Sequence, residues 1–234
     1  VCRQAKESAW SHKASFRSDA VSRPCRPPGS PLAKSNISSY LDAFMNTMIP
    51  MSESEKELRA LLAKRVVMLD GAMGTTIRGY GLDEEAARGQ RFAGAPKDLL
   101  NNGDILSLTR PEVIGDIHRR FLVAGSDIIE TNTFSATAIA QSEFFVEDPR
   151  EHGGRKDPGF FQKILENPFL RDLAWEMNVE SVRLAKKMAD EVGNATGRKR
   201  YVAGAIGPLT VSLSVSPDAN DAAFRVVTFD QVKQ

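Results

Sequence analysis

The chain has 234 residues, of which 41% are hydrophobic and 26% are charged, and its formal net charge is +1. This balance is ordinary for a globular protein with one domain of moderate size, and it gives no sign of nucleic-acid or anionic-membrane binding. No apolar stretch approaches the roughly 20 residues that a membrane-spanning helix needs.

Residues 1–50 differ in composition from the rest. Up to Lys34 they carry seven Lys or Arg against Glu7 and Asp19, with frequent serines and four clustered prolines. Such a segment cannot bury enough apolar surface to offset its ordering entropy, so we predict a disordered, basic, Ser/Pro-rich segment. This composition is typical of an organelle transit peptide, and it also fits translated upstream sequence that the mature protein lacks.

The only cysteines, Cys2 and Cys25, both lie in this segment. They make no disulfide framework and no Cys-x-x-Cys motif, and we expect no zinc site there. Cysteine usage therefore predicts a reducing compartment, and we expect a cytoplasmic protein unless residues 1–50 direct it to an organelle.

An ordered domain is predicted over residues 51–234. Ser52 and Glu55 have the spacing of a capping box, and apolar residues follow at helical spacing: Leu58, Leu61 and Leu62. The apolar run Val66–Leu69 then predicts a short buried strand.

A second unit begins at Thr109 and Glu112, which again have capping-box spacing, with Pro111 in the first turn. The helix is predicted to end at Gly125 in a left-handed conformation. A second strand, 127–131, follows at once.

A longer helix is predicted from about Arg171 to Val192, ended by Gly193, and a third strand covers 200–206. Residues 144–170, with three prolines, are predicted to form a surface insertion ahead of that helix. A further helix opens at Phe229.

Alternating strands and helices predict parallel strands with right-handed crossovers. Both a (β/α)₈ barrel and an open doubly wound sheet fit this pattern, and both place function at the carboxyl ends of the strands.

Polar residues follow the first two strands. Asp70 precedes the small-residue turn Gly71–Gly74, in which backbone amides can approach an anion while the carboxylate binds a cation. An amino acid has both charges, but a tight turn capped by Asp explains the same residues. After the second strand come Glu130, Thr131, Asn132 and Thr133, which fit pocket walls or a cap for the next helix.

Other residues and motifs are weaker evidence for a functional site. The loop Ser214–Asp221 is polar, as active-site loops are, and His118 is predicted to be an ordinary helix residue. His152 lies in a polar loop, and the chain contains no P-loop, dinucleotide fingerprint or serine nucleophile elbow.

The succession of these motifs resembles the homocysteine S-methyltransferase family, and most of all the homocysteine-binding domain of cobalamin-dependent methionine synthases. The resemblance covers about 51–234 and rests on five stretches: 67–77, 88–92 with 101–106, 124–134, 202–208 and 214–218.

This resemblance implies a (β/α)₈ barrel that binds L-homocysteine at its C-terminal face. It implies a zinc ion, held by three cysteine thiolates, that stabilises the substrate thiolate. It also implies methylcobalamin and methyltetrahydrofolate carried by other modules of a longer chain. Asp70 and the Gly71–Gly74 amides then anchor the amino-acid end of the substrate, and 130–133 form pocket walls.

Two departures matter. After Gly207-Pro208 the chain has Leu209-Thr210 where the family usually has Thr-Asn. The pattern also contains only about the first three βα units, so the family's zinc cysteines are expected beyond Gln234 and no catalytic residue is predicted within this chain. We therefore expect a partial barrel with open edges, poorly stable and inactive by itself.

Three alternatives stay open. The first alternative is a homocysteine methyltransferase whose methyl donor is S-methylmethionine or betaine. The second is a non-catalytic truncated remnant. The third is an unrelated barrel enzyme with an anion site.

Overall fold

The computed structural model describes residues 50–233. Contacts within the chain divide it into two units, residues 1–51 and 52–234. The described helices and strands belong to the second unit. The disorder predicted for 1–50, like the surroundings of Cys2 and Cys25, lies outside the described residues apart from Pro50.

In chain order the elements are α2 (Glu53–Leu62), α3 (Met73–Arg78), α4 (Glu84–Arg88), η1 (Gly103–Ile105), α5 (Leu106–Thr109), α6 (Pro111–Ala124), β1 (Ile128–Glu130), α7 (Ala138–Phe145), η2 (Pro149–His152), α8 (Pro158–Glu166), α9 (Pro168–Thr196), β2 (Tyr201–Ala203) and α10 (Phe229–Lys233). Helix dominates over strand, and no helix between residues 50 and 233 is long and apolar enough to span a membrane.

The strands are parallel, as predicted. β1 pairs with β2 so that Ile129 lies opposite Val202, and Leu69 makes a parallel bridge with Ile128. The amide of Asp70 continues this pairing by donating to the carbonyl of Ile128 over 3.0 Å. The three segments therefore lie side by side in chain order, as successive βα units do. Closure into a (β/α)₈ barrel stays a prediction.

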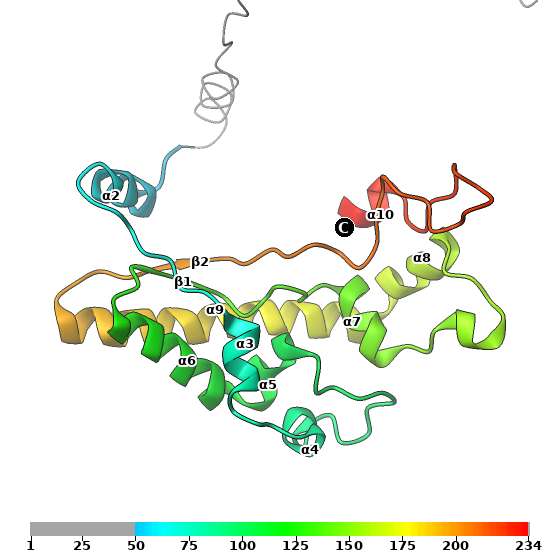
Figure 1. Cartoon of the computed structure of the whole chain (residues 1–234), viewed down its shortest axis with the longest axis horizontal. Helices are drawn as coiled ribbons and strands as arrows, with labels where there is room; N and C mark the ends of the chain where they lie inside the picture. Colours follow the sequence, from blue (N-terminus) through cyan, green and yellow to red (C-terminus); the bar gives the residue numbers. More distant parts are fainter. Residues whose placement is uncertain (1–49, 234) are drawn as a thin grey trace, which may run out of the picture. The chain divides into compact units, whose positions relative to one another are not determined.

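The run Val66–Leu69 is not the buried strand that its composition predicts. Its contact with β1 is limited to the bridge at Leu69 and the Met68 carbonyl, which accepts the Ile128 amide, and Val66 and Met68 are 77% and 56% exposed. β1 and β2 are likewise shorter than the predicted 127–131 and 200–206. A strand is buried on both faces only where layers cover both, and α6 and α9 lie together on one side of β1 and β2 (Figure 1).

The core between α6, α9 and the strands is apolar and closely packed. Leu122 of α6, Ile129 of β1 and four α9 residues form one cluster: Ala185, Met188, Ala189 and Val192. The two helices pack closely at Gly115, where a Cβ would lie 3.4 Å from the Leu184 side chain, in van der Waals contact. This packing orients β1, whose carboxyl end carries the predicted site residues.

The predicted helix starts are correct in one case and wrong in the other. Ser52 caps α2 by accepting from the Glu55 amide, although the Glu55 carboxylate bonds to Arg59 and does not complete the box. Thr109 does not cap α6. It ends α5, its hydroxyl donates to the carbonyl of Ile105, and the residue before α6 is Arg110.

The predicted helix ends divide in the same way. Gly125 ends α6 with φ +119°, as expected. Gly193 does not end α9, which continues to Thr196 and stops at Gly197 with φ +64°. Gly193 has a different use, because a Cβ there would lie 3.1 Å from the carbonyl oxygen of Arg198, where the chain turns back towards β2.

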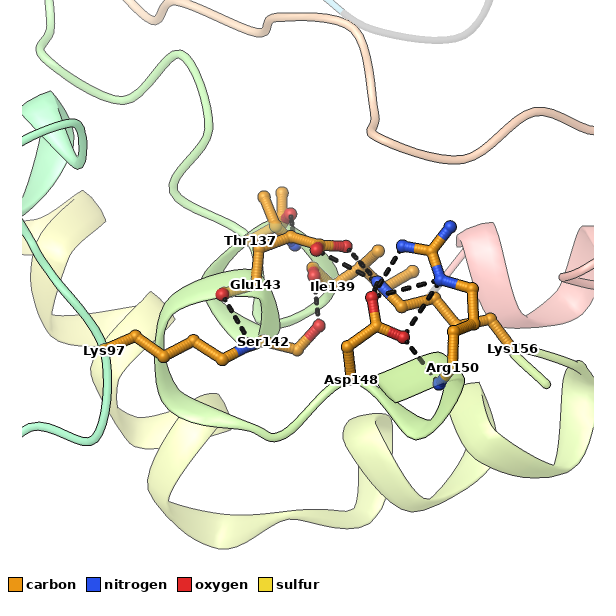
Figure 2. A network of polar contacts seen from close by, with 9 residues as sticks. Lys97, Thr137, Ile139, Ser142, Glu143, Asp148, Arg150 and Lys156 are labelled. Carbon is orange, nitrogen blue, oxygen red and sulfur yellow. Dashed lines mark hydrogen bonds and ion pairs between the residues drawn. The ribbon is translucent and has the colours of Figure 1, made fainter. Parts of the chain in front are cut away.

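Residues 144–170 pack more tightly than a surface insertion would. They contain η2 and α8, and Phe161 is fully buried. Lys156, whose side chain is 13% exposed, pairs with Glu143 at 2.9 Å and Asp148 at 3.3 Å. Figure 2 shows this cluster, in which Arg150 also binds Asp148. Whether these residues are inserted relative to the family stays a prediction.

His118 lies in α6, as predicted, but it is fully buried and neither ring nitrogen has a hydrogen-bond partner among the described residues. Burial lowers the pKa of His118 from 6.5 to about 4, because the charged form is not solvated. Between these two values the unfolded chain binds more protons than the folded one, so the His118 contribution destabilises the fold as the pH falls.

We expect His118→Leu to remove this pH dependence. From pH 7 to pH 4 the free energy of unfolding of the unmodified chain should fall by about 3 kcal/mol more than that of the variant. Urea unfolding of both proteins at both pH values measures this difference. The other titrating groups are the same in the two proteins, so their contributions cancel. His152→Leu, at a side chain that is 70% exposed, is the control. Equal pH dependence in the chain and the His118 variant would contradict the prediction.

Candidate functional site

A pocket of about 450 Å³ opens at the carboxyl end of β1, between the turn after Leu69 and the segment after β2. It is lined by eight of the nine residues that the sequence predicts as substrate-binding: Asp70, Gly71, Ala72, Met73, Gly74, Glu130, Thr131 and Asn132. The ninth, Thr133, is not among the lining residues. The fold thus brings two motifs 60 residues apart in the sequence to one place, and their role in binding stays a prediction.

Asp70 holds the strand end together and faces the pocket. Its Oδ1 accepts the amide of Glu130 over 2.9 Å, while its own amide binds Ile128. Burial raises the pKa of Asp70 to about 6, and no cationic side chain of the described part offsets this. A half-buried carboxylate without a partner cation suits a ligand that brings a positive charge.

The turn after Asp70 is strained at Ala72. Ala72 has φ 50° and ψ 34°, the left-handed region that favours glycine, and it is the only such non-glycine residue between 50 and 233. This conformation costs about 1 kcal/mol. It starts α3, so that Met73 and Gly74 lie in the first turn of the helix at the edge of the pocket.

Thr131 and Thr133 join neighbouring strands beyond their regular pairing. Their hydroxyl oxygens lie 2.7 Å apart, the Thr133 hydroxyl donates to the carbonyl of Ala205, and the Ala205 amide donates to the Thr131 hydroxyl. The Thr133 hydroxyl is therefore used in holding the segment after β2. Thr131 does the same and also lines the pocket.

Asn132 is buried, and its side-chain NH₂ group and backbone carbonyl already have partners. Its Nδ2 donates to the Gly103 carbonyl at 2.9 Å and to the Ser107 hydroxyl at 3.1 Å, and its backbone carbonyl accepts from Ser181. Asn132 thus supports the pocket wall more than it offers groups to a ligand.

Asp104 is a pocket residue that sequence reasoning missed. It is 7% exposed, and its Oδ2 accepts the amide of Ser135 over 2.8 Å. Burial raises its pKa to about 6. The stretch 101–106 contributed to the family resemblance, but it follows no predicted strand. Its position in the sequence therefore did not indicate a pocket residue.

The pocket is acidic. Asp70, Asp104 and Glu130 line it, and no Lys, Arg or His does so among the described residues. Met73, Ile77 and Phe134 add apolar surface. This combination favours a small ligand with a cationic group and an apolar or sulfur-containing part.

The segment after β2 approaches the pocket only at its start. The Gly207 amide donates to the carbonyl of Phe134, and a Cβ at Gly207 would lie 2.4 Å from that oxygen, so only glycine fits. The polar loop predicted as an active-site wall does not line this pocket. Val215 and Asp218 line a separate hollow of about 780 Å³ beside Arg155 and Lys156.

The described residues do not form a metal centre. Between residues 50 and 233 no group of three His, Cys, Asp or Glu side chains is placed to hold a metal ion, and the sequence has no cysteine there. The three-thiolate zinc site implied by the resemblance therefore has no counterpart in this part of the chain.

Parallel strands in chain order, helical crossovers and a polar pocket at the strand ends define an α/β protein of the repeated βα type. The chain belongs to the homocysteine S-methyltransferase family, whose model matches residues 67–234. The family predicted from the motifs at 70–76 and 130–134 is thereby confirmed.

Two solved structures of the homocysteine methyltransferase MmuM from Escherichia coli are similar. The metallated form is 21% identical, with a TM-score of 0.42, and the match covers 64% of this chain and 41% of that one. The oxidised form is 22% identical, with a TM-score of 0.40 and coverages of 64% and 40%. This chain thus spans about two fifths of the length of those structures.

Proposed function

We propose that this chain supplies the amino-acid-binding part of an enzyme that methylates L-homocysteine to methionine. The observation that carries the proposal is the acidic pocket at the end of β1, in a chain of the homocysteine S-methyltransferase family. Asp70 binds the ammonium group, the first turn of α3 faces the carboxylate, and Met73, Ile77 and Phe134 enclose the side chain.

In this reaction the sulfur lone pair of the homocysteine thiolate forms the new S–CH₃ bond. The bond between the methyl group and its donor breaks, and the donor leaves with that electron pair. The donor proposed first is methylcobalamin, recharged from methyltetrahydrofolate by other modules, as in methionine synthase. S-methylmethionine and betaine are the alternative donors.

Zinc is the metal that the proposed reaction calls for, because it keeps the substrate thiol ionised at neutral pH. The described residues do not fit a zinc site, so no step of the proposal passes through the metal. For residues 50–233 taken alone, the missing ligand set favours substrate binding without catalysis.

Calorimetric titration of the chain with L-homocysteine at pH 7.5 tests the proposal. We expect L-homocysteine to bind at least tenfold more tightly than 4-mercaptobutyrate, which has no amino group, because a hydrogen bond to a charged group contributes about 1.5–3 kcal/mol. Equal affinity for the two thiols, or no binding of L-homocysteine, would overturn it.

A further inference from the structure

Behind the pocket, buried polar side chains from three parts of the fold meet. One group comes from 102–107, another from the loop that follows β1, and the third from α7 and α9. We refer to six of them, together with the backbone of the half-buried Ser135, as the loop clamp: Asn102, Asp104, Ser107, Asn132, Gln141 and Ser181.

Hydrogen bonds inside the loop clamp join residues far apart in the sequence. Asn102 donates to Gln141 at 2.7 Å, and Gln141 donates to the Ser135 carbonyl at 3.1 Å. Ser181 donates to Ser107 at 2.7 Å. Together with the bonds of Asn132 to Gly103 and Ser107, these contacts hold the loop after β1 at both of its ends.

Asp104 differs from every other member of the loop clamp because it is charged. A buried carboxylate without a partner cation is costly, and a neutral residue could accept the single amide of Ser135. Only the Ser135 amide makes a hydrogen bond to Asp104, and the neighbouring amide of Phe134 also lowers the pKa of this carboxyl, so two successive N–H groups of the loop favour a negative charge here. Asp104 reaches the pocket surface as well, so the same group both fixes the loop and faces the ligand space.

We propose that Asp104 is a positioning residue of the homocysteine pocket. By accepting the amide of Ser135 it keeps the loop 131–136 in the conformation in which Thr131 and Phe134 line the pocket. The inference rests on the proposed function for its substrate, but its effect on the loop does not depend on that function.

Asp104→Asn is the direct test, because it keeps the shape but removes the negative charge and leaves one acceptor oxygen beside the successive amides of Phe134 and Ser135. Hydrogen exchange of the ligand-free chain should become about tenfold faster in peptides covering 133–136 and stay unchanged in α6 and α9. Asp98→Asn is the matched control, since Asp98 lies six residues earlier with a side chain that is 87% exposed.

Affinity provides the second readout. At a temperature where both proteins are folded, L-homocysteine should bind Asp104→Asn about tenfold more weakly than Asp98→Asn. A residue with a merely structural role would change global unfolding without this local and ligand-specific pattern. Unchanged exchange in 133–136 together with unchanged affinity would overturn the inference.

The two proposals fail in distinguishable ways. If the unmodified chain binds no L-homocysteine, the proposed function fails, while exchange in 133–136 still decides whether Asp104 holds the loop. If Asp104→Asn does not fold, Asp104→Glu keeps the charge and displaces the carboxylate by one methylene. It should loosen the same peptides, and full protection of them would overturn the inference.

Discussion

Asp70→Asn is expected to weaken the binding of L-homocysteine by about 10- to 100-fold, since an uncharged amide replaces the carboxylate that we propose pairs with the substrate ammonium. The substitution keeps an oxygen that accepts the Glu130 amide, so the strand end should stay folded. Calorimetric titration at pH 7.5 measures the loss, and Asp98→Asn is the exposed control. Equal affinity of the Asp70 variant and the unmodified chain would remove Asp70 from the site.

The pH dependence of binding gives a further check on Asp70. Its pKa is raised to about 6, so the carboxylate is ionised above that pH and protonated below it. Affinity for L-homocysteine should therefore fall as the pH drops through 6. Burial also raises the pKa of Asp104 to about 6, and Asp104 lines the same pocket. The affinity of the unmodified chain should therefore depend on the ionisation of both carboxyl groups. In Asp70→Asn only Asp104 remains, so the affinity should change less with pH.

Asp127→Asn should be the most destabilising of these substitutions, by about 2 kcal/mol, because it removes the charge of a buried carboxylate that binds two half-exposed arginines. Asp127, with a side chain that is 2% exposed, accepts two hydrogen bonds from Arg65 at 2.6 and 2.7 Å and one from Arg198 at 2.8 Å. It also accepts the amide of Met68 at 3.1 Å. The cluster therefore fastens the segment before Asp70 to β1.

Urea unfolding at pH 7 measures the loss, and Asp190→Asn is its control. Asp190 pairs with Lys186 on the exposed face of α9, where such pairs contribute less than about 0.5 kcal/mol. The hydrogen bond from Arg65 is the main cause of the lowered pKa of Asp127. The ionised Asp127 carboxylate therefore stabilises the fold at pH values above the ordinary carboxyl pKa. This stabilisation is lost as the pH falls below that value towards the lowered pKa. Similar losses for the two variants would contradict the prediction.

Much of the fold follows from local patterns. The apolar spacing of α6 and α9, the left-handed glycine at 125 and the Ser52 cap are all local, and the structure contains each of them. The wrong predictions concern helix ends, where spacing does not show which neighbouring backbone group a residue contacts. Thr109 turns to the carbonyl of Ile105, and Gly193 is needed for the close approach of Arg198.

The strand lengths show the same limit. Composition marks Val66–Leu69 as apolar, and an apolar run is typical of a strand buried on both faces. Burial depends on which layers cover the strand, and helices α6 and α9 lie on one side (Figure 1). Most of the run is therefore exposed, and only Met68 and Leu69 interact with β1, although its composition is that of a buried strand.

The sequence by itself determined the family, the order of the βα units and the two strand ends that carry polar residues. These properties are readable because spacing, turn chemistry and motif order are encoded along the chain. Only the tertiary structure decided which polar atoms remain available in the pocket. It uses the Thr133 hydroxyl and the Asn132 amide for internal bonds and adds Asp104 to the pocket wall. Hydrogen-bond partners 29 to 72 residues apart make that choice, and a local pattern carries no information about their distance in space.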